Sequence, residues 1–232
     1  HDALPIWRRR RAGPRPEAGE DRVEGSDAAR RFGAVRLADV AAGPYESFLG
    51  WIRDAPDHLG GPDWPDWEAE PPYRFRRHGG FADLRPNLPP PETLPRVSGE
   101  HHWWIGPLHD HFGHFISEVA SRLPASLAVD ADAVPVFGAD LGRSPALRRP
   151  PGFMEQIGEW FGLPVARWRV LDSPVLFETL GVVPQQEHYG DKLGADGPEA
   201  APSDAYLDLL TENAERRLGR PERRGLLYVS RA

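Results

Sequence analysis

The chain has 232 residues and a formal net charge of −7, and 40% of its residues are hydrophobic. This length and composition fit one substantial α/β domain or two small ones, and the negative charge argues against nucleic acid as a partner. The absence of cysteine excludes disulfides, thiolate metal sites and cysteine nucleophiles. No apolar run approaches the roughly 20 residues that span a bilayer, so we expect no transmembrane segment. We expect a cytoplasmic protein for which peripheral membrane association stays open.

Residues 1–94 read as an irregular, Arg/Pro/Gly-rich extension, because glycine and proline pairs leave little room for regular elements. Within this extension, Val35–Val40 alternates in polarity and predicts a short strand, and Tyr73–Phe75 predicts a brief one. Trp64 and Trp67 are expected to be small hydrophobic anchors, with stacking on a sugar as the alternative.

From residue 95 onward, strands and helices alternate. His101–Ile105 reads as a strand, and His111–Val129 as a helix that Pro124 ends or kinks. The remaining predicted elements are strands at Val134–Phe137, Arg167–Leu171, Val175–Val183 and Leu226–Val229, and helices at Phe153–Phe161 and Ser203–Leu218. This order is typical of a parallel sheet with crossover helices, so we predict a Rossmann-like, doubly wound α/β domain over residues 95–232. Neither a Gly-x-Gly-x-x-Gly fingerprint nor a Walker A run is present.

A histidine-rich stretch, His101–Ala125, lies at the predicted strand-to-helix junction, where α/β proteins tend to place their chemistry. On a helix, His114 and Glu118 are four residues apart, Arg122 lies four further on, and His111 lies one turn before His114. A carboxylate beside an imidazole raises its pKa, so the pair can act as a general acid or base. A structural hydrogen-bonded pair is the alternative.

A metal site is a second interpretation of the same histidines. His109, His111 and His114 resemble the HxHxDH motif of the metallo-β-lactamase-like hydrolases. Gly113 stands where that family has a metal-binding aspartate, and His188 is the only histidine further downstream. We therefore expect no metal, and a metal-dependent hydrolase stays the alternative.

Two motifs carry a closer resemblance. Residues 114–123, HFISEVASRL, resemble the H-[FW]-h-h-[DE]-x-L-P-R-L signature of glycosyltransferase family 61, with Ala120-Ser121 in place of Leu-Pro. Residues 227–231, LYVSR, resemble that family's hY[IVL]SR strand. Between these two motifs, residues 153–163 occupy the place of its F…LGL helix, and residues 175–184 resemble its h-F-x-x-L-h-h-P segment. The family includes transferases of bacterial capsular-polysaccharide biosynthesis.

The resemblance implies the first half of a GT-B-like pair of Rossmann domains, with a donor-binding domain expected beyond Ala232. It implies sugar transfer from a nucleotide sugar to a glycan or polysaccharide acceptor, without a metal or other cofactor. His114, oriented by Glu118, would be the catalytic pair, and His111, Arg122 and Arg231 would bind substrate. A non-catalytic module that binds a glycan or a partner protein is the remaining alternative.

Overall fold

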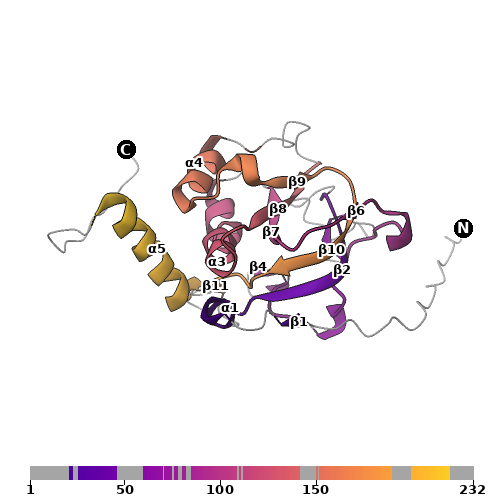
Figure 1. The fold of residues 1–232 in the computed structure, drawn as a ribbon, viewed down its shortest axis with the longest axis horizontal. Helices are drawn as coiled ribbons and strands as arrows, with labels where there is room; N and C mark the ends of the chain where they lie inside the picture. Colours follow the sequence, from indigo (N-terminus) through magenta and orange to yellow (C-terminus); the bar gives the residue numbers. More distant parts are fainter. Residues whose placement is uncertain are drawn as a thin grey trace, which may run out of the picture.

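A computed structural model describes twelve parts of the chain, which are residues 21–22, 26–45, 60–69, 71–74, 76–77, 80–81, 85–108, 110, 112–141, 150, 152–189 and 200–219. Most of the described strands belong to one eight-stranded mixed sheet. Two small two-stranded ladders accompany it, β4 (Arg76–Arg77) with β5 (Gly80–Phe81), and β11 (Glu187–Tyr189) with β12 (Ala200–Pro202). The protein is thus a mixed α/β fold (Figure 1).

One half of the sheet is parallel. Its four strands lie side by side in the order β9 (Arg169–Leu171), β8 (Val134–Ala139), β7 (His102–Leu108) and β10 (Val175–Val182). The chain order is therefore 3-2-1-4, which is the beginning of the Rossmann strand order. All four were predicted, β9 from an alternating pattern and the others from bulky or apolar runs, and the structure confirms them.

Beyond β10 the sheet becomes antiparallel. Strand β2 (Val35–Gly43) pairs with β10 from Val35 opposite Val182 to Ala42 opposite Val175. Short strands complete the margins, namely β1 (Asp21–Arg22) and β3 (Gly61–Pro62) on β2, and β6 (Arg96–Val97) on β10. The predicted strand at residues 35–40 is confirmed and is longer than expected. Residues before 95 are thus built into the sheet, whereas the sequence predicted an irregular extension apart from it.

The link from β7 to β8 was predicted as one helix and is divided into three. It consists of α2 (Phe112–His114), the π-helical segment η3 (Phe115–Val119) and α3 (Arg122–Val129). Pro124 explains the break, because a continuous helix would need a proline N–H to bond the Ala120 carbonyl. That carbonyl instead accepts the Leu123 N–H at 3.0 Å, and Pro124 lies in the first turn of α3, where an N–H has no helical partner anyway.

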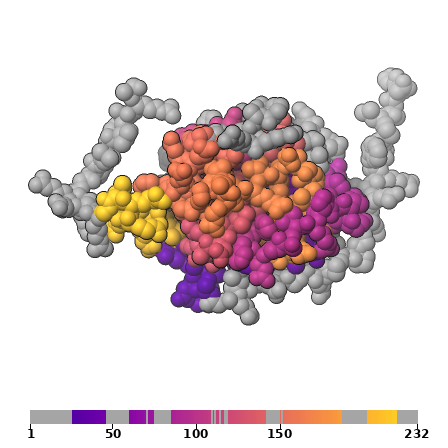
Figure 2. All heavy atoms as spheres, turned by 45° about the horizontal axis from the view of Figure 1, so that its top comes forward, coloured from indigo at the N-terminus to yellow at the C-terminus, as the bar shows by residue number. Residues whose placement is uncertain are grey.

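The two predicted helices α4 (Gly152–Phe161) and α5 (Asp204–Leu218) begin and end within one residue of their expected bounds, whereas α1 (Asp27–Phe32) was not predicted. Helix α4 stops at Gly162, whose φ of 80° is left-handed. Helix α5 is capped by Ser203, whose hydroxyl accepts the Tyr206 N–H, and it forms one end of the molecule (Figures 1 and 2). Helix α1 lies beside it, joined by an Arg31–Asp208 ion pair. The 3-10 turns are η1 (Trp67–Ala69), η2 (Pro91–Thr93) and η5 (Val165–Arg167).

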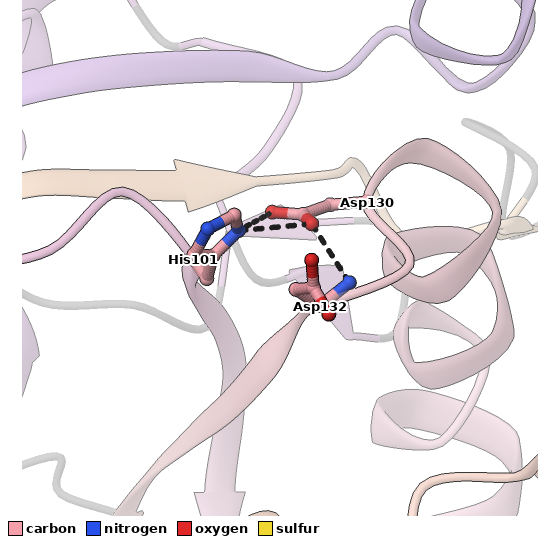
Figure 3. Close-up of side chains that lie close together, drawn as sticks. All are labelled: His101, Asp130 and Asp132. Carbon is pink, nitrogen blue, oxygen red and sulfur yellow. Dashed lines mark hydrogen bonds and ion pairs between the residues drawn. The ribbon is translucent and has the colours of Figure 1, made fainter.

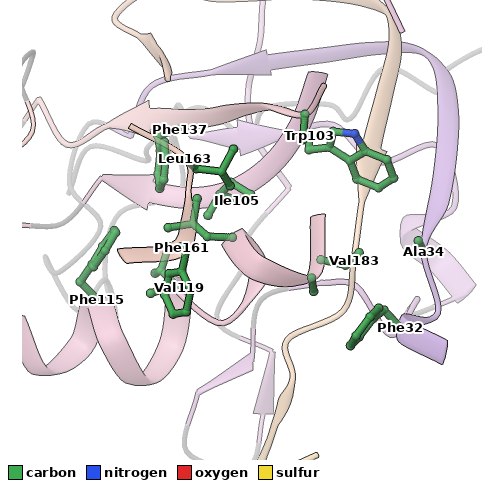
Figure 4. Close-up of a cluster of buried hydrophobic side chains, with 14 of the residues drawn as sticks. Phe32, Ala34, Trp103, Ile105, Phe115, Val119, Phe137, Phe161, Leu163 and Val183 are labelled. Carbon is green, nitrogen blue, oxygen red and sulfur yellow. The ribbon is translucent and has the colours of Figure 1, made fainter. Parts of the chain in front are cut away.

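The two faces of the sheet are covered differently. Alternation along β7 sends Trp103 and Ile105 toward one face and Trp104 toward the other. The first face packs against residues of α1, η3, α3, α4 and α5, and Figure 4 shows part of this core. Within the described residues, no α-helix contributes to the core on the second face. Because β9 and β10 are joined by residues 172–174 alone, this link has no crossover helix, so the sheet is not doubly wound there.

The second face is closed by the sheet itself and by the segment before residue 95. After β2, Tyr45 forms a parallel bridge to Asp140 at the end of β8, so the sheet curls back on itself. The Tyr45 ring lies over Gly138, where a β-carbon would come within 2.8 Å of it. Trp64 and Trp67 are 1% and 7% exposed inside this second core. Their predicted anchoring role is confirmed, and their burial leaves no ring face for a sugar.

Candidate functional site

The predicted site lies at the carboxyl end of β7. This strand ends at Leu108, and α2 begins four residues later at Phe112. Residues 114 and 118 follow on the helical backbone, and β7 itself lies between β8 and β10 in the sheet. In open α/β sheets, ligands bind beyond the carboxyl ends of the strands, where the strand order reverses. The side chains of His114 and Glu118 lie outside the described residues, as do all of His109, His111 and Arg231.

Two backbone irregularities meet at this junction. The β7–β8 register skips between Trp104 and Gly106, which leaves Ile105 without an opposite residue on β8. Gly106 has a φ of 143°, and a β-carbon there would come within 3.3 Å of Val119 Cγ1. Val119 ends the π-helical segment, which is closed by the Ala120 N–H bonded to the Phe115 carbonyl at 2.7 Å. Such π-segments are rare and often occur at functional sites.

Arg122 turns inward. Its side chain is buried, with the residue 1% exposed. Its Nη1 donates to the Ile105 carbonyl at 3.2 Å and its Nη2 to the Tyr73 carbonyl at 2.7 Å. Arg122 was predicted to bind substrate, but its burial leaves no surface for a substrate in this conformation. The predicted stripe at four-residue spacing also passes through the π-helical segment, where α-helical spacing does not apply.

The carboxyl end of β8 adds further side chains to this edge. Asp140 is fully buried and follows β8 directly. Phe112 is 53% exposed, and its ring meets the edge of Phe153 from α4, with ring centroids 5.6 Å apart. The edge thus combines a helix start, a buried carboxylate and a half-exposed aromatic ring.

A second polar cluster lies at the opposite edge of the sheet, at the amino ends of β7 and β8 (Figure 3). Asp130, just after α3, is the acceptor at its centre. Its carboxylate accepts from Arg36 Nη2 at 3.0 Å, Trp103 Nε1 at 2.9 Å and the Asp132 N–H at 3.0 Å. His101 Nδ1 lies 3.0 Å from the same carboxylate. We call these five residues the Asp130 cluster.

The Asp130 cluster is charged and partly buried. Burial by itself would raise the pKa of Asp130, but hydrogen bonds from Trp103, His101 and the Asp132 N–H lower it, and the net shift is downward. Asp130 is therefore held as a carboxylate. Burial lowers the pKa of His102, and electrostatic interactions with Arg169 and His101 lower it further, despite a contact with the Gly99 carbonyl that raises it.

A metal ion fits the Asp130 cluster poorly, although His101, Asp130 and Asp132 offer ligand atoms within 4.8 Å of one another. Both carboxylate oxygens of Asp130 already accept hydrogen bonds, and the Arg36 guanidinium would repel a cation. The contacts join β2, β7 and the α3–β8 turn, which points to a structural role. Sequence reasoning missed this cluster because its partners are up to 94 residues apart.

Comparison with known proteins gives no match among family models, curated proteins or solved structures. Among the described helices, none combines the length and the apolar composition needed to cross a bilayer.

Proposed function

We propose that this protein is a nucleotide-sugar-dependent glycosyltransferase that acts on a glycan or polysaccharide acceptor, built on the first half of a GT-B-like fold. The single observation that carries the proposal is the position of the histidine-bearing motif. Residues 114–123, which carry the resemblance to glycosyltransferase family 61, begin in α2, the first helix after the carboxyl end of β7. That strand lies where the parallel order reverses, between β8 and β10.

The order of the other elements supports the proposal. Helix α4 and strand β10 fall where the resemblance expects a helix and the segment that ends at Pro184. Glycosyl transfer needs a base that removes the proton of the acceptor hydroxyl, and positive charge that stabilises the departing diphosphate. His114 would be that base, oriented by Glu118. His111 and Arg231 would contact the substrates.

The structure changes what we propose for Arg122. A guanidinium that is buried and bonded to two main-chain carbonyls holds the fold together and does not reach a diphosphate. Charge stabilisation at the leaving group therefore falls to Arg231 or to arginines that come from elsewhere. No metal takes part in the proposed reaction.

The test is an assay of nucleoside diphosphate release from a panel of nucleotide sugars, with and without oligosaccharide acceptors, on protein that includes the donor-binding domain implied by the resemblance. The proposal predicts release that depends on the acceptor and persists when a chelator is present. Release that stops with chelator and returns with zinc or manganese would favour the metal-dependent hydrolase. Oligosaccharide binding without turnover of any donor would favour the non-catalytic module.

A further inference from the structure

We infer that Arg122 is a positioning residue, which fixes the backbone of residues 114–118 by clamping the π-helical segment to the bulge of β7. The assignment of residues 114–118 to a catalytic site rests on the proposed function. The contacts of Arg122 do not depend on it.

The clamp begins at the bulge. In a regular ladder the Ile105 carbonyl would face a neighbouring strand, but the register skip leaves this residue without an opposite partner on β8. A buried carbonyl needs a donor. Arg122 Nη1 supplies it at 3.2 Å, so the guanidinium occupies a position that the bulge creates.

The second arm of the clamp reaches the segment before residue 95. Arg122 Nη2 donates to the Tyr73 carbonyl at 2.7 Å. Tyr73 is itself fixed, because it is 3% exposed and its ring packs edge-on against Trp64 with centroids 5.0 Å apart. Its hydroxyl also donates to Asp66. The guanidinium is therefore anchored to two rigid neighbours in different parts of the chain.

The π-helical segment is held between these anchors and β7. Arg122 starts α3 two residues after Ala120, whose N–H closes the π-turn on the Phe115 carbonyl. Val119 packs at Gly106, where any larger residue would push it away. If the guanidinium leaves, the start of α3 loses its hydrogen bond to β7, and a regular α-helical turn can replace the π-turn. Such a change would rotate residues 114–118 relative to the carboxyl end of β7.

Arginine suits this task and lysine does not. The planar guanidinium has donors on two arms that point to different carbonyls, while a lysine ammonium is a single point of charge. Arg122→Lys therefore keeps the charge and most of the volume but cannot hold both carbonyls. Arg167 is the matched control, because its Nη2 also donates to two carbonyls, those of Ala131 and Ala133, at the amino end of β8.

The experiment is NMR of the whole chain carrying Arg122→Lys or Arg167→Lys. The pH titration of the His114 imidazole, assigned by its loss in His114→Gln, should shift by at least about 0.3 pH units in Arg122→Lys. Hydrogen exchange of the Ala120 amide should accelerate at least about tenfold, while that of the Phe177 amide in β10 stays unchanged. Arg167→Lys should leave all three signals as in the wild type.

Gly106→Ala perturbs the same junction from the strand side and should shift the His114 titration as well, so the test does not depend on one variant. The inference is overturned if folded Arg122→Lys keeps the wild-type His114 titration and Ala120 exchange. It is also overturned if both arginine variants change the signals equally, since that would report general destabilisation. If the protein transfers sugar, Arg122→Lys should lower kcat at least about tenfold with little change in KM. Failure of the proposed function would remove this kinetic result and leave the NMR results intact.

Discussion

Replacing Asp130 by asparagine tests whether the Asp130 cluster joins β2, β7 and the α3–β8 turn. The change keeps the size of the side chain and removes its charge. The carboxylate receives four polar contacts, from Arg36, Trp103, His101 and the Asp132 N–H. Asparagine has a single acceptor oxygen, so about two of these donors would face an NH2 group.

A buried donor left without an acceptor costs about 1–3 kcal/mol. The side chains of Arg36 and His101 are 22% and 51% exposed, so both can turn partly to water, and the lower half of that range applies. We therefore expect Asp130→Asn to lower the free energy of unfolding by about 2–4 kcal/mol at pH 7. Asp132→Asn is the control, because the described contact of Asp132 with the cluster comes from its main-chain N–H, and it should change stability by less than about 0.5 kcal/mol.

The effect should depend on pH in a defined direction. The folded-state pKa of Asp130 is lowered, so the unfolded chain takes up the proton first as the pH falls. The stabilisation is therefore fully present above the pKa of Asp130 in the unfolded chain, about 3.9. It is lost as the pH falls through the lower pKa that Asp130 has in the folded protein. In urea unfolding from pH 7 to pH 3, the wild type should exceed Asp130→Asn in unfolding free energy by an amount that is constant above about pH 5 and shrinks below about pH 4. A difference under about 0.5 kcal/mol at pH 7, or one that stays constant down to pH 3, would refute the reasoning.

Three further predictions concern the frame around the site. Asp39 has a φ of 51° within β2, a left-handed value that strains a side chain with a β-carbon. In thermal melts, Asp39→Val should therefore lower the unfolding free energy by about 1–2 kcal/mol, while Asp39→Gly should lower it little. Equal losses for the two variants would exclude backbone strain at this position. Gly138→Ala should cost about 2 kcal/mol, because the new β-carbon would lie 2.8 Å from the Tyr45 ring and 3.0 Å from the Gly43 carbonyl oxygen. A β-carbon at Gly152 would meet open space, so Gly152→Ala should leave the unfolding free energy unchanged. Similar urea midpoints for Gly138→Ala and Gly152→Ala would contradict the curled sheet. Ser203→Ala removes the cap of α5 and a bond to Gln186, so it should cost about 1–2 kcal/mol, and wild-type helicity and stability by circular dichroism would contradict this.

Elements with strong local patterns could be predicted from the sequence. The apolar runs of β7, β8 and β10 indicate strands of a parallel sheet even when the neighbouring strands are not known. The caps of α5 are equally local, because Ser203 bonds within its own first turn and Gly219 follows its last residue. These features depend on residues a few positions apart, so periodicity and capping rules find them.

Features that depend on distant packing could not be predicted. The π-helical segment arises where Val119 meets Gly106, and the sequence signals only the break at Pro124. The inward turn of Arg122 depends on a carbonyl 49 residues away, at Tyr73. For this reason the stripe of His114, Glu118 and Arg122, which helical spacing suggested as a surface site, includes the buried Arg122. The antiparallel pairing of β2 with β10 joins residues more than a hundred positions apart, and a nine-residue strand carries no signal of its partner.

Sugar transfer by His114→Ala, compared with the wild type, tests the central claim most directly. His101→Ala is the control, because His101 lies at the opposite edge of the sheet in the Asp130 cluster. With an active donor and acceptor pair, the account predicts that His114→Ala lowers turnover at least about a hundredfold, as expected for loss of a general base, in a protein that stays folded. His101→Ala should keep turnover near that of the wild type. Near-normal turnover in His114→Ala would contradict the account and remove this histidine from the mechanism.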